Sequence, residues 1–91
     1  MSNVFTHCLL TIEAEHHPQT PARILEHVTR HNLLPQWFSL RRLTGDRVRI
    51  VLELDAFELN SVDLMAKRIA NIPSVISVSR TLMRRRTPIM P

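Results

Sequence analysis

The sequence predicts an α+β domain in which two helices cover one face of a single antiparallel sheet. Two observations lead to this prediction: four segments alternate apolar with polar residues, and two others repeat apolar residues at helical spacing. The segments follow in the order β-α-β-β-α-β over 91 residues. This order is typical of a ferredoxin-like, split-βαβ sandwich, with an antiparallel four-stranded sheet in the order 4-1-3-2.

The first half of the chain supports a strand, a helix and a second strand. A period of two predicts the first strand over residues 4–14. Thr20 is a suitable N-cap, Pro21 suits the first helical position, and Asn32 suits a left-handed residue that ends the helix. The second strand follows over residues 37–43. The positions expected to face the core are Cys8, Leu10, Ile12, Ala14, Ile24, Leu25 and Val28.

The second half supports a hairpin partner, a helix and a last strand. Gly45, the only glycine, occupies the turn before a strand over residues 47–54, where positive φ costs least. The second helix is expected to begin at Ser61, with Asp63 in its first turn, and to stop before Pro73. The last strand covers residues 75–80. The expected core positions are Val48, Ile50, Leu52, Leu54, Val62, Met65, Ile69 and Ile72.

The length and the net charge of the chain limit the classes of protein to which it can belong. One domain of this length buries roughly 60–65% of the surface of its unfolded chain, so it is only modestly stable alone. The net charge is +4, and Arg80 and residues 84–86 place four arginines in the last twelve residues. We therefore predict a domain over residues 1–82 and a basic tail over residues 83–91. One cysteine and no signal peptide favour the cytoplasm.

Catalytic and metal-binding motifs are missing from the sequence. It contains no G-x-S-x-G, no H-E-x-x-H, no P-loop and no glycine-rich dinucleotide turn, so we assign no catalytic residues. His27 and His31 share a helix face at the spacing that zinc ligands can have, and His16 and His17 are neighbours. No third ligand has a suitable spacing. Solvated histidines are therefore the favoured interpretation, and no metal site is assigned.

The start of the first helix is a candidate ligand site. Helix N-termini present free N–H groups that attract carboxylates, and His16, His17 and Gln19 precede this one. Pro21 removes one donor, and bulky Gln19 narrows the approach. The alternative of a capped helix start without a ligand stays open.

The predicted sheet also leaves two surfaces uncovered. The strand over residues 37–43 would be an exposed edge, which is a liability unless something pairs with it. The face away from the helices would carry Leu9, Val51 and either Trp37 or Phe38 among polar residues. An apolar patch of this kind indicates a partner.

An RNA-binding module is a further alternative, because such domains can share this element order. They stack bases on aromatic residues of the central strands. The matching positions here are Leu9, Thr11, Arg49 and Val51, and none is aromatic. This observation argues against RNA more strongly than the basic tail argues for it.

Several segments carry a resemblance to a known family. They are His17-Pro18-Gln19-Thr20, Arg23-Ile24-Leu25 with Val28, Val51-Leu52-Glu53-Leu54, Ser61-Val62-Asp63-Leu64 and Val75-Ile76-Ser77-Val78. Over about residues 4–80 the chain resembles an ACT domain, and within that family the short regulatory subunit of bacterial acetolactate synthase.

The resemblance implies a non-catalytic subunit that binds and activates the large catalytic subunit of acetolactate synthase in branched-chain amino-acid biosynthesis. That large subunit would carry thiamine diphosphate, Mg²⁺ and FAD, and this chain no cofactor of its own. The alternative is a free-standing ACT domain that senses an amino acid for another enzyme. ACT domains commonly pair through the second strand and first helix, which implies a homodimer edge at Trp37, Phe38, Ser39, Leu40 and Arg41.

The resemblance also implies sites. Feedback amino acids bind ACT domains at the seam between paired copies, and a branched-chain amino acid is the ligand implied here. The implied ligand contacts are His16, His17, Gln19, Thr20, Ala22 and Gln36. His16 and Gln19 stand where valine-sensitive small subunits carry Asn and Gly, which argues against valine. The expected contacts with the catalytic partner are Leu9, Val51, Leu82, Met83 and Arg84.

Overall fold

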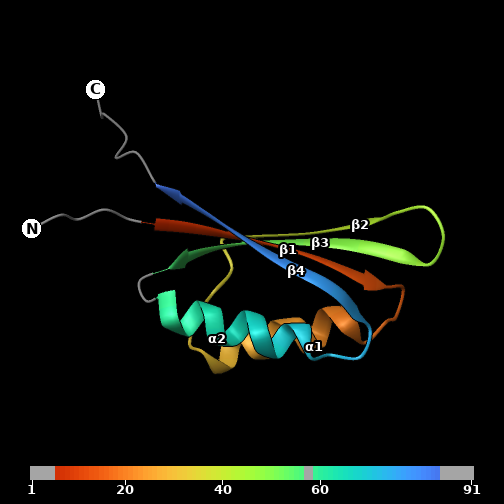
Figure 1. The fold of residues 1–91 in the computed structure, drawn as a ribbon, viewed down its shortest axis with the longest axis horizontal. Coiled ribbons are helices and arrows are strands. Elements are labelled where there is room, and N and C mark those ends of the chain that lie inside the picture. The colour runs from red at the N-terminus through yellow and green to blue at the C-terminus, as the bar shows by residue number, and fades with distance from the viewer. Residues whose placement is uncertain (1–5, 57–58, 85–91) are drawn as a thin grey trace, which may run out of the picture.

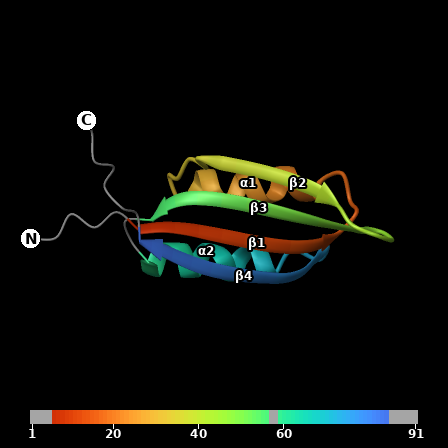
Figure 2. The same cartoon turned by 90° about the horizontal axis from the view of Figure 1, so that it is seen from above.

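The computed structural model describes residues 6–56 and 59–84, and its elements follow the predicted order. They are β1 (Thr6–Glu15), α1 (Thr20–Arg30), β2 (Trp37–Arg42), β3 (Arg47–Ala56), α2 (Leu59–Ala70) and β4 (Val75–Arg84). The strands form one antiparallel sheet in the order β2-β3-β1-β4. Both helices lie on one face of this sheet (Figure 1), and α1 lies beneath the β2 side while α2 lies beneath the β4 side (Figure 2). The predicted ferredoxin-like sandwich is confirmed.

The core lies between the sheet and the helices. Period-two alternation in β1 and β3 sends every second residue toward the helices, where Ile12 and its register partner Ile50 are fully buried. Each such Leu or Ile stabilises the fold by about 1.5–3 kcal/mol on burial. The buried apolar residues are Cys8, Leu10, Ile12, Ala14, Ile24, Val28, Val48, Ile50, Leu52, Leu54, Val62, Met65, Ile69 and Ile72. The predicted core positions are therefore confirmed, except that Leu25 is only half-buried against the cluster.

Two predicted chain reversals are also confirmed. Asn32 has a φ of 57° and follows the end of α1, where its N–H donates to the Thr29 carbonyl at 2.9 Å. Gly45 has a φ of 74° in the β2–β3 turn. A Cβ at Gly45 would meet open space, so the positive φ alone explains the preference for glycine.

The start of α1 differs from the prediction. Gln19, not Thr20, is the N-cap residue, and it makes no side-chain capping hydrogen bond. Thr20 is the first helical residue, only 1% exposed, and its hydroxyl lies 2.6 Å from the Ser74 hydroxyl. The reason is burial: a buried hydroxyl must find a partner, and Ser74 supplies one across the domain. Because the helix begins one residue earlier than predicted, Pro21 is its second residue and not its first, although it still lies in the first turn.

The bounds of α2 and β4 also differ from those predicted from the sequence. α2 begins at Leu59, before the predicted Ser61, so Asp63 lies beyond its first turn and forms an ion pair with Arg80 of β4 instead. β4 runs to Arg84, because the register with β1 continues through the pair Thr6 and Arg84. Two residues assigned to the tail thus lie in the sheet. Residues 85–91, and the predicted strand residues 4 and 5, lie outside the described residues.

Candidate functional site

A cavity of about 320 Å³ lies where the β1–α1 loop meets the α2–β4 loop. Three of the predicted ligand contacts, His17, Gln19 and Thr20, line it. The remaining lining residues are Glu15, Arg23, Ile72, Pro73 and Ser74, which sequence reasoning missed. The predicted strand order held a usable signal, because it makes β1 and β4 neighbours and so brings their adjoining loops together.

Two hydrogen bonds join the loops that form this cavity. The Glu15 N–H donates to the Ser74 carbonyl at 2.8 Å, and the Thr20 and Ser74 hydroxyls share a hydrogen bond at 2.6 Å. Since residues more than fifty positions apart make these bonds, the cavity depends on the complete tertiary fold.

Backbone donors at the start of α1 are mostly engaged within the loop. The Gln19 N–H donates to Nδ1 of His17 at 3.2 Å, and the Thr20 N–H donates to the His17 carbonyl at 3.1 Å. Pro21 has no N–H to offer. The backbone N–H groups of Gln19 and Thr20 are therefore not free to bind a ligand at this cavity.

Two side chains of opposite charge border the cavity. Glu15 ends β1, Arg23 lies in the first turn of α1, and both are exposed. Within residues 6–56 and 59–84, neither forms an ion pair with another side chain. A carboxylate and a guanidinium at one cavity suit a ligand that carries both an ammonium and a carboxylate group.

The other predicted ligand contacts do not line this cavity. His16 faces the β2–β3 turn, where its N–H donates to the Asp46 carbonyl at 2.7 Å, and Ala22 is exposed on α1. The Gln36 N–H donates to the Glu53 carbonyl at 2.7 Å, and Glu53 pairs with Leu9, six residues before Glu15 in β1. Gln36 therefore lies near the opposite end of the sheet in the same chain.

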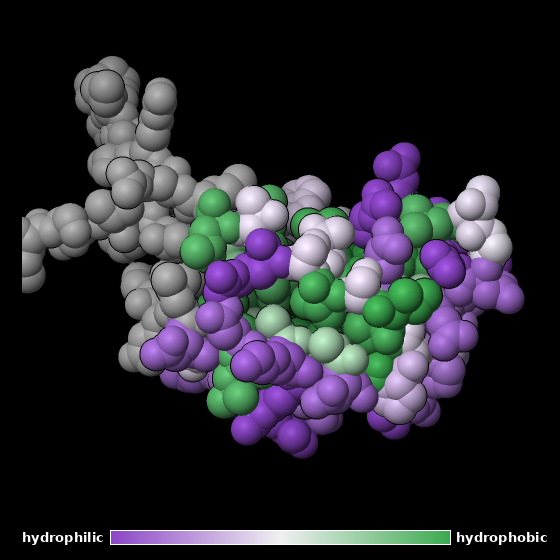
Figure 3. Space-filling view, in the orientation of Figure 1, coloured by the Kyte–Doolittle hydropathy of each residue, from purple (hydrophilic) through white to green (hydrophobic). Residues whose placement is uncertain are grey.

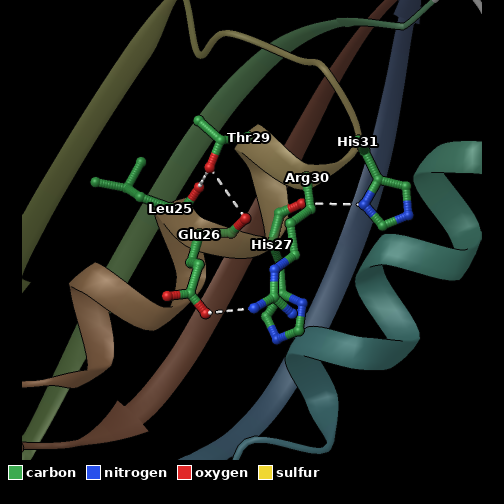
Figure 4. A network of polar contacts seen from close by, with 6 residues as sticks. All are labelled: Leu25, Glu26, His27, Thr29, Arg30 and His31. Carbon is green, nitrogen blue, oxygen red and sulfur yellow. Dashed lines mark hydrogen bonds and ion pairs between the residues drawn. The ribbon is translucent and has the colours of Figure 1, made fainter.

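The histidines of α1 belong to a local polar network (Figure 4). Nδ1 of His31 lies 3.0 Å from the His27 carbonyl, and Arg30 pairs with Glu26 at 3.2 Å. In the part of the chain that the structure describes, no three His, Cys, Asp or Glu side chains are grouped to hold a metal ion. His16 and His17 are both exposed in the loop.

The open face of the sheet carries polar side-chain pairs around a small apolar centre. Leu9 and Val51 are half-buried there, as expected, and Trp37 faces the same side because its register partner is Glu53. Nδ1 of His7 lies 3.4 Å from a Glu53 carboxylate oxygen. Across the face, Arg49 donates to Glu13 at 3.0 Å.

The predicted contacts at the end of β4 do not all share that face. Leu82 pairs with Cys8, whose side chain enters the core, so Leu82 lies on the helix side and away from Leu9 and Val51. The strand continues through Met83 and Arg84, which pair with His7 and Thr6. A partner that contacts Leu9, Val51 and Leu82 together would have to wrap around the edge of β4.

Both edges of the sheet expose apolar side chains. On the β2 edge, Trp37 is 59% and Leu40 is 47% exposed. On the β4 side, Ile76 and Leu82 are exposed on the strand and Leu64 on α2; Figure 3 shows this side, with apolar surface between the sheet and the mostly hydrophilic surface of the helix. The edges are the surfaces most suited to protein contact.

Two further observations concern the single cysteine and the length of the helices. Burial raises the pKa of the Cys8 thiol, although Arg80 opposes this, so Cys8 is not poised as a nucleophile. Among the helices of residues 6–56 and 59–84, none is long and apolar enough to cross a membrane.

Known structures resemble this chain in fold but not closely in sequence. The ACT domain from GTP pyrophosphokinase of Chlorobium tepidum superposes with a TM-score of 0.72 over 85% of this chain and 99% of that domain, at 10% identity. The C-terminal domain of the MgtC protein from Mycobacterium tuberculosis gives a TM-score of 0.72 over 91% of this chain and 93% of that domain, at 8% identity.

A third structure shares the fold as part of a larger chain. Homoserine dehydrogenase from Thiobacillus denitrificans gives a TM-score of 0.72 at 20% identity over 89% of this chain, which spans 17% of that enzyme. No protein-family model matches the sequence, and no curated protein matches it. The chain thus has the fold of an ACT domain, and function has to be argued from its own sites.

Proposed function

We propose that this chain is a non-catalytic regulatory subunit that binds and activates the large, thiamine-diphosphate-dependent subunit of acetolactate synthase. The observation that carries the proposal is the sheet, which has helices on one face only and exposes Trp37 and Leu40 along the β2 edge. The segments that resemble the short regulatory subunit supply the choice of partner. The ACT-type fold supports a regulatory role without choosing among partners.

Pairing of two copies along β2 would join their sheets into one and cover the exposed β2 edge of each copy. A two-fold axis beside β2 sets the two strands antiparallel and places Gln36 of one copy beside the Arg41 end of the other. Arg42, at that end, pairs with Val48 and thus lies level with Ala14, just before the β1–α1 loop. The dimer therefore offers one reason why Gln36 and the loop could share a ligand although they are separated in one chain.

Activation requires that the subunit bind the active state of its partner more tightly than the inactive one. The test is to add the purified chain to the large subunit encoded nearest to it and measure turnover and co-purification. We expect both a stable complex and a rise in turnover. A large subunit that neither binds nor responds would contradict the proposal.

A free-standing amino-acid sensor is the second candidate, and the cavity at the β1–α1 loop favours it. Glu15 and Arg23 would hold the ammonium and the carboxylate of a small amino acid. A ligand that binds only the folded state raises its apparent stability. A thermal-shift screen of the amino acids should then show one that raises Tm in the wild type but not in Glu15→Gln. The control Glu26→Gln removes a carboxylate outside the cavity and should keep the response.

A further inference from the structure

A second hollow lies between the two helices, and positively charged side chains line it. Its volume is about 330 Å³, and Arg23, His27, Arg68, Asn71, Ile72 and Pro73 line it. Arg23 and His27 come from α1, and Arg68 lies in the last turn of α2. We call these six residues the interhelical groove. It shares Arg23, Ile72 and Pro73 with the loop cavity, and His27, Arg68 and Asn71 line the groove alone.

The cations of this groove are not neutralised by the protein. In the described residues, neither Arg23 nor Arg68 forms an ion pair, although Arg30 next along α1 is paired with Glu26. Nδ1 of His27 is buried and has no hydrogen-bond partner there. Both guanidinium groups are exposed to solvent and so are free to bind an anion, which would also offset the repulsion between like charges that share this hollow.

We propose that the interhelical groove binds a small phosphorylated molecule through its phosphate group. The two guanidinium groups can each donate a pair of hydrogen bonds to phosphate oxygens, and Asn71 can donate from its amide. Ile72 and Pro73 offer an apolar wall to the rest of the molecule. This site does not rest on the proposed acetolactate synthase partnership, but it adjoins the proposed amino-acid cavity and shares Arg23 with it.

His27 adds a protonation signature to the site. Burial comes first and Arg30 second in lowering its pKa; Arg68 and His31 lower it further, and Glu26 alone raises it. From α2, Arg68 is the charged residue that lines the groove with His27. A bound dianion would oppose the effect of Arg30 and Arg68, raise the pKa of His27 and favour uptake of a proton. Binding should therefore tighten as pH falls toward the His27 pKa.

The experiment is an NMR titration of the whole chain with inorganic phosphate at pH 7.5, at constant ionic strength. Sulfate, whose charge does not change between pH 5 and 8, serves for the pH series. We expect both anions to shift the His27 ring signals and sulfate to raise its pKa, while the other four histidines stay unmoved. Arg68→Gln should weaken phosphate binding roughly five- to tenfold, since it removes charge-assisted hydrogen bonds at a partly exposed site.

The matched control is Lys67→Gln, which removes the same charge from the neighbouring exposed residue of α2 but lies outside the groove. This variant should change the dissociation constant for phosphate by less than about a factor of two, as expected for a screened surface charge. Equal weakening by both variants, a general shift of all histidines, or no shift of His27 would overturn the proposal. Glu15→Gln should not affect phosphate binding, which separates this site from the amino-acid cavity.

Discussion

The hydrogen bond between Thr20 and Ser74 should contribute measurably to stability, because it joins two loops at a buried position. Thr20→Val keeps the shape of the side chain and removes the hydroxyl, leaving the half-buried Ser74 hydroxyl without that partner. The expected cost is about 1–2 kcal/mol in the free energy of unfolding. For a domain of this size, that corresponds to a fall in Tm of about 4–16 °C.

Urea unfolding of four proteins measures this contribution: the wild type, Thr20→Val, Ser74→Ala and the double variant. The double-mutant cycle should give a coupling energy of about 0.5–1.5 kcal/mol. Thr29→Val is the matched control, because its exposed hydroxyl bonds only to the Leu25 and Glu26 carbonyls of its own helix. It should change stability by less than about 0.5 kcal/mol. Equal losses at Thr20 and Thr29, or zero coupling, would refute the reasoning.

Three other predictions follow from burial and exposure. Ile50→Ala empties a fully buried position between sheet and helices, and should lower the urea-measured free energy of unfolding by about 2–5 kcal/mol. Trp37→Lys adds a charge to the proposed dimer edge; sedimentation should show a shift toward monomer while circular dichroism stays unchanged, and a persistent dimer would count against pairing through β2. Burial raises the pKa of Cys8 above its ordinary value of 9.0, so the folded state favours the protonated thiol; stability should fall as pH rises through that value, and Cys8→Ala should show less of this fall.

The sheet was predictable from sequence because its signals are local. Alternation from Val48 to Leu54 determines which face of β3 is buried, and Asn32 and Gly45 mark chain reversals that need a positive φ. Such features depend on a residue and its near neighbours in the chain. They therefore survive unchanged when the tertiary structure forms.

The site was less predictable, because its residues meet only through tertiary contacts. Thr20 has the chemistry of an N-cap, yet its hydroxyl bonds to Ser74 of the α2–β4 loop. Glu15 and Arg23 show no motif in the sequence, and they border one cavity only because β1 ends beside the start of α1 and against β4. The interhelical groove is similar, since Arg23 and Arg68 come from different helices. No spacing rule relates residues of that kind.

The two edges of the sheet differ in how well they can accept another strand. β4 has a register irregularity where Glu13 and Ala14 meet it, and it turns the charged Arg80 toward the helix side. Bulges and inward-pointing charges both hinder strand addition. The first four residues of β2, from Trp37 to Leu40, carry no charge, no proline and no irregularity in their pairing with β3. A second copy should therefore add to β2, which leaves β4 and the open face for a different protein.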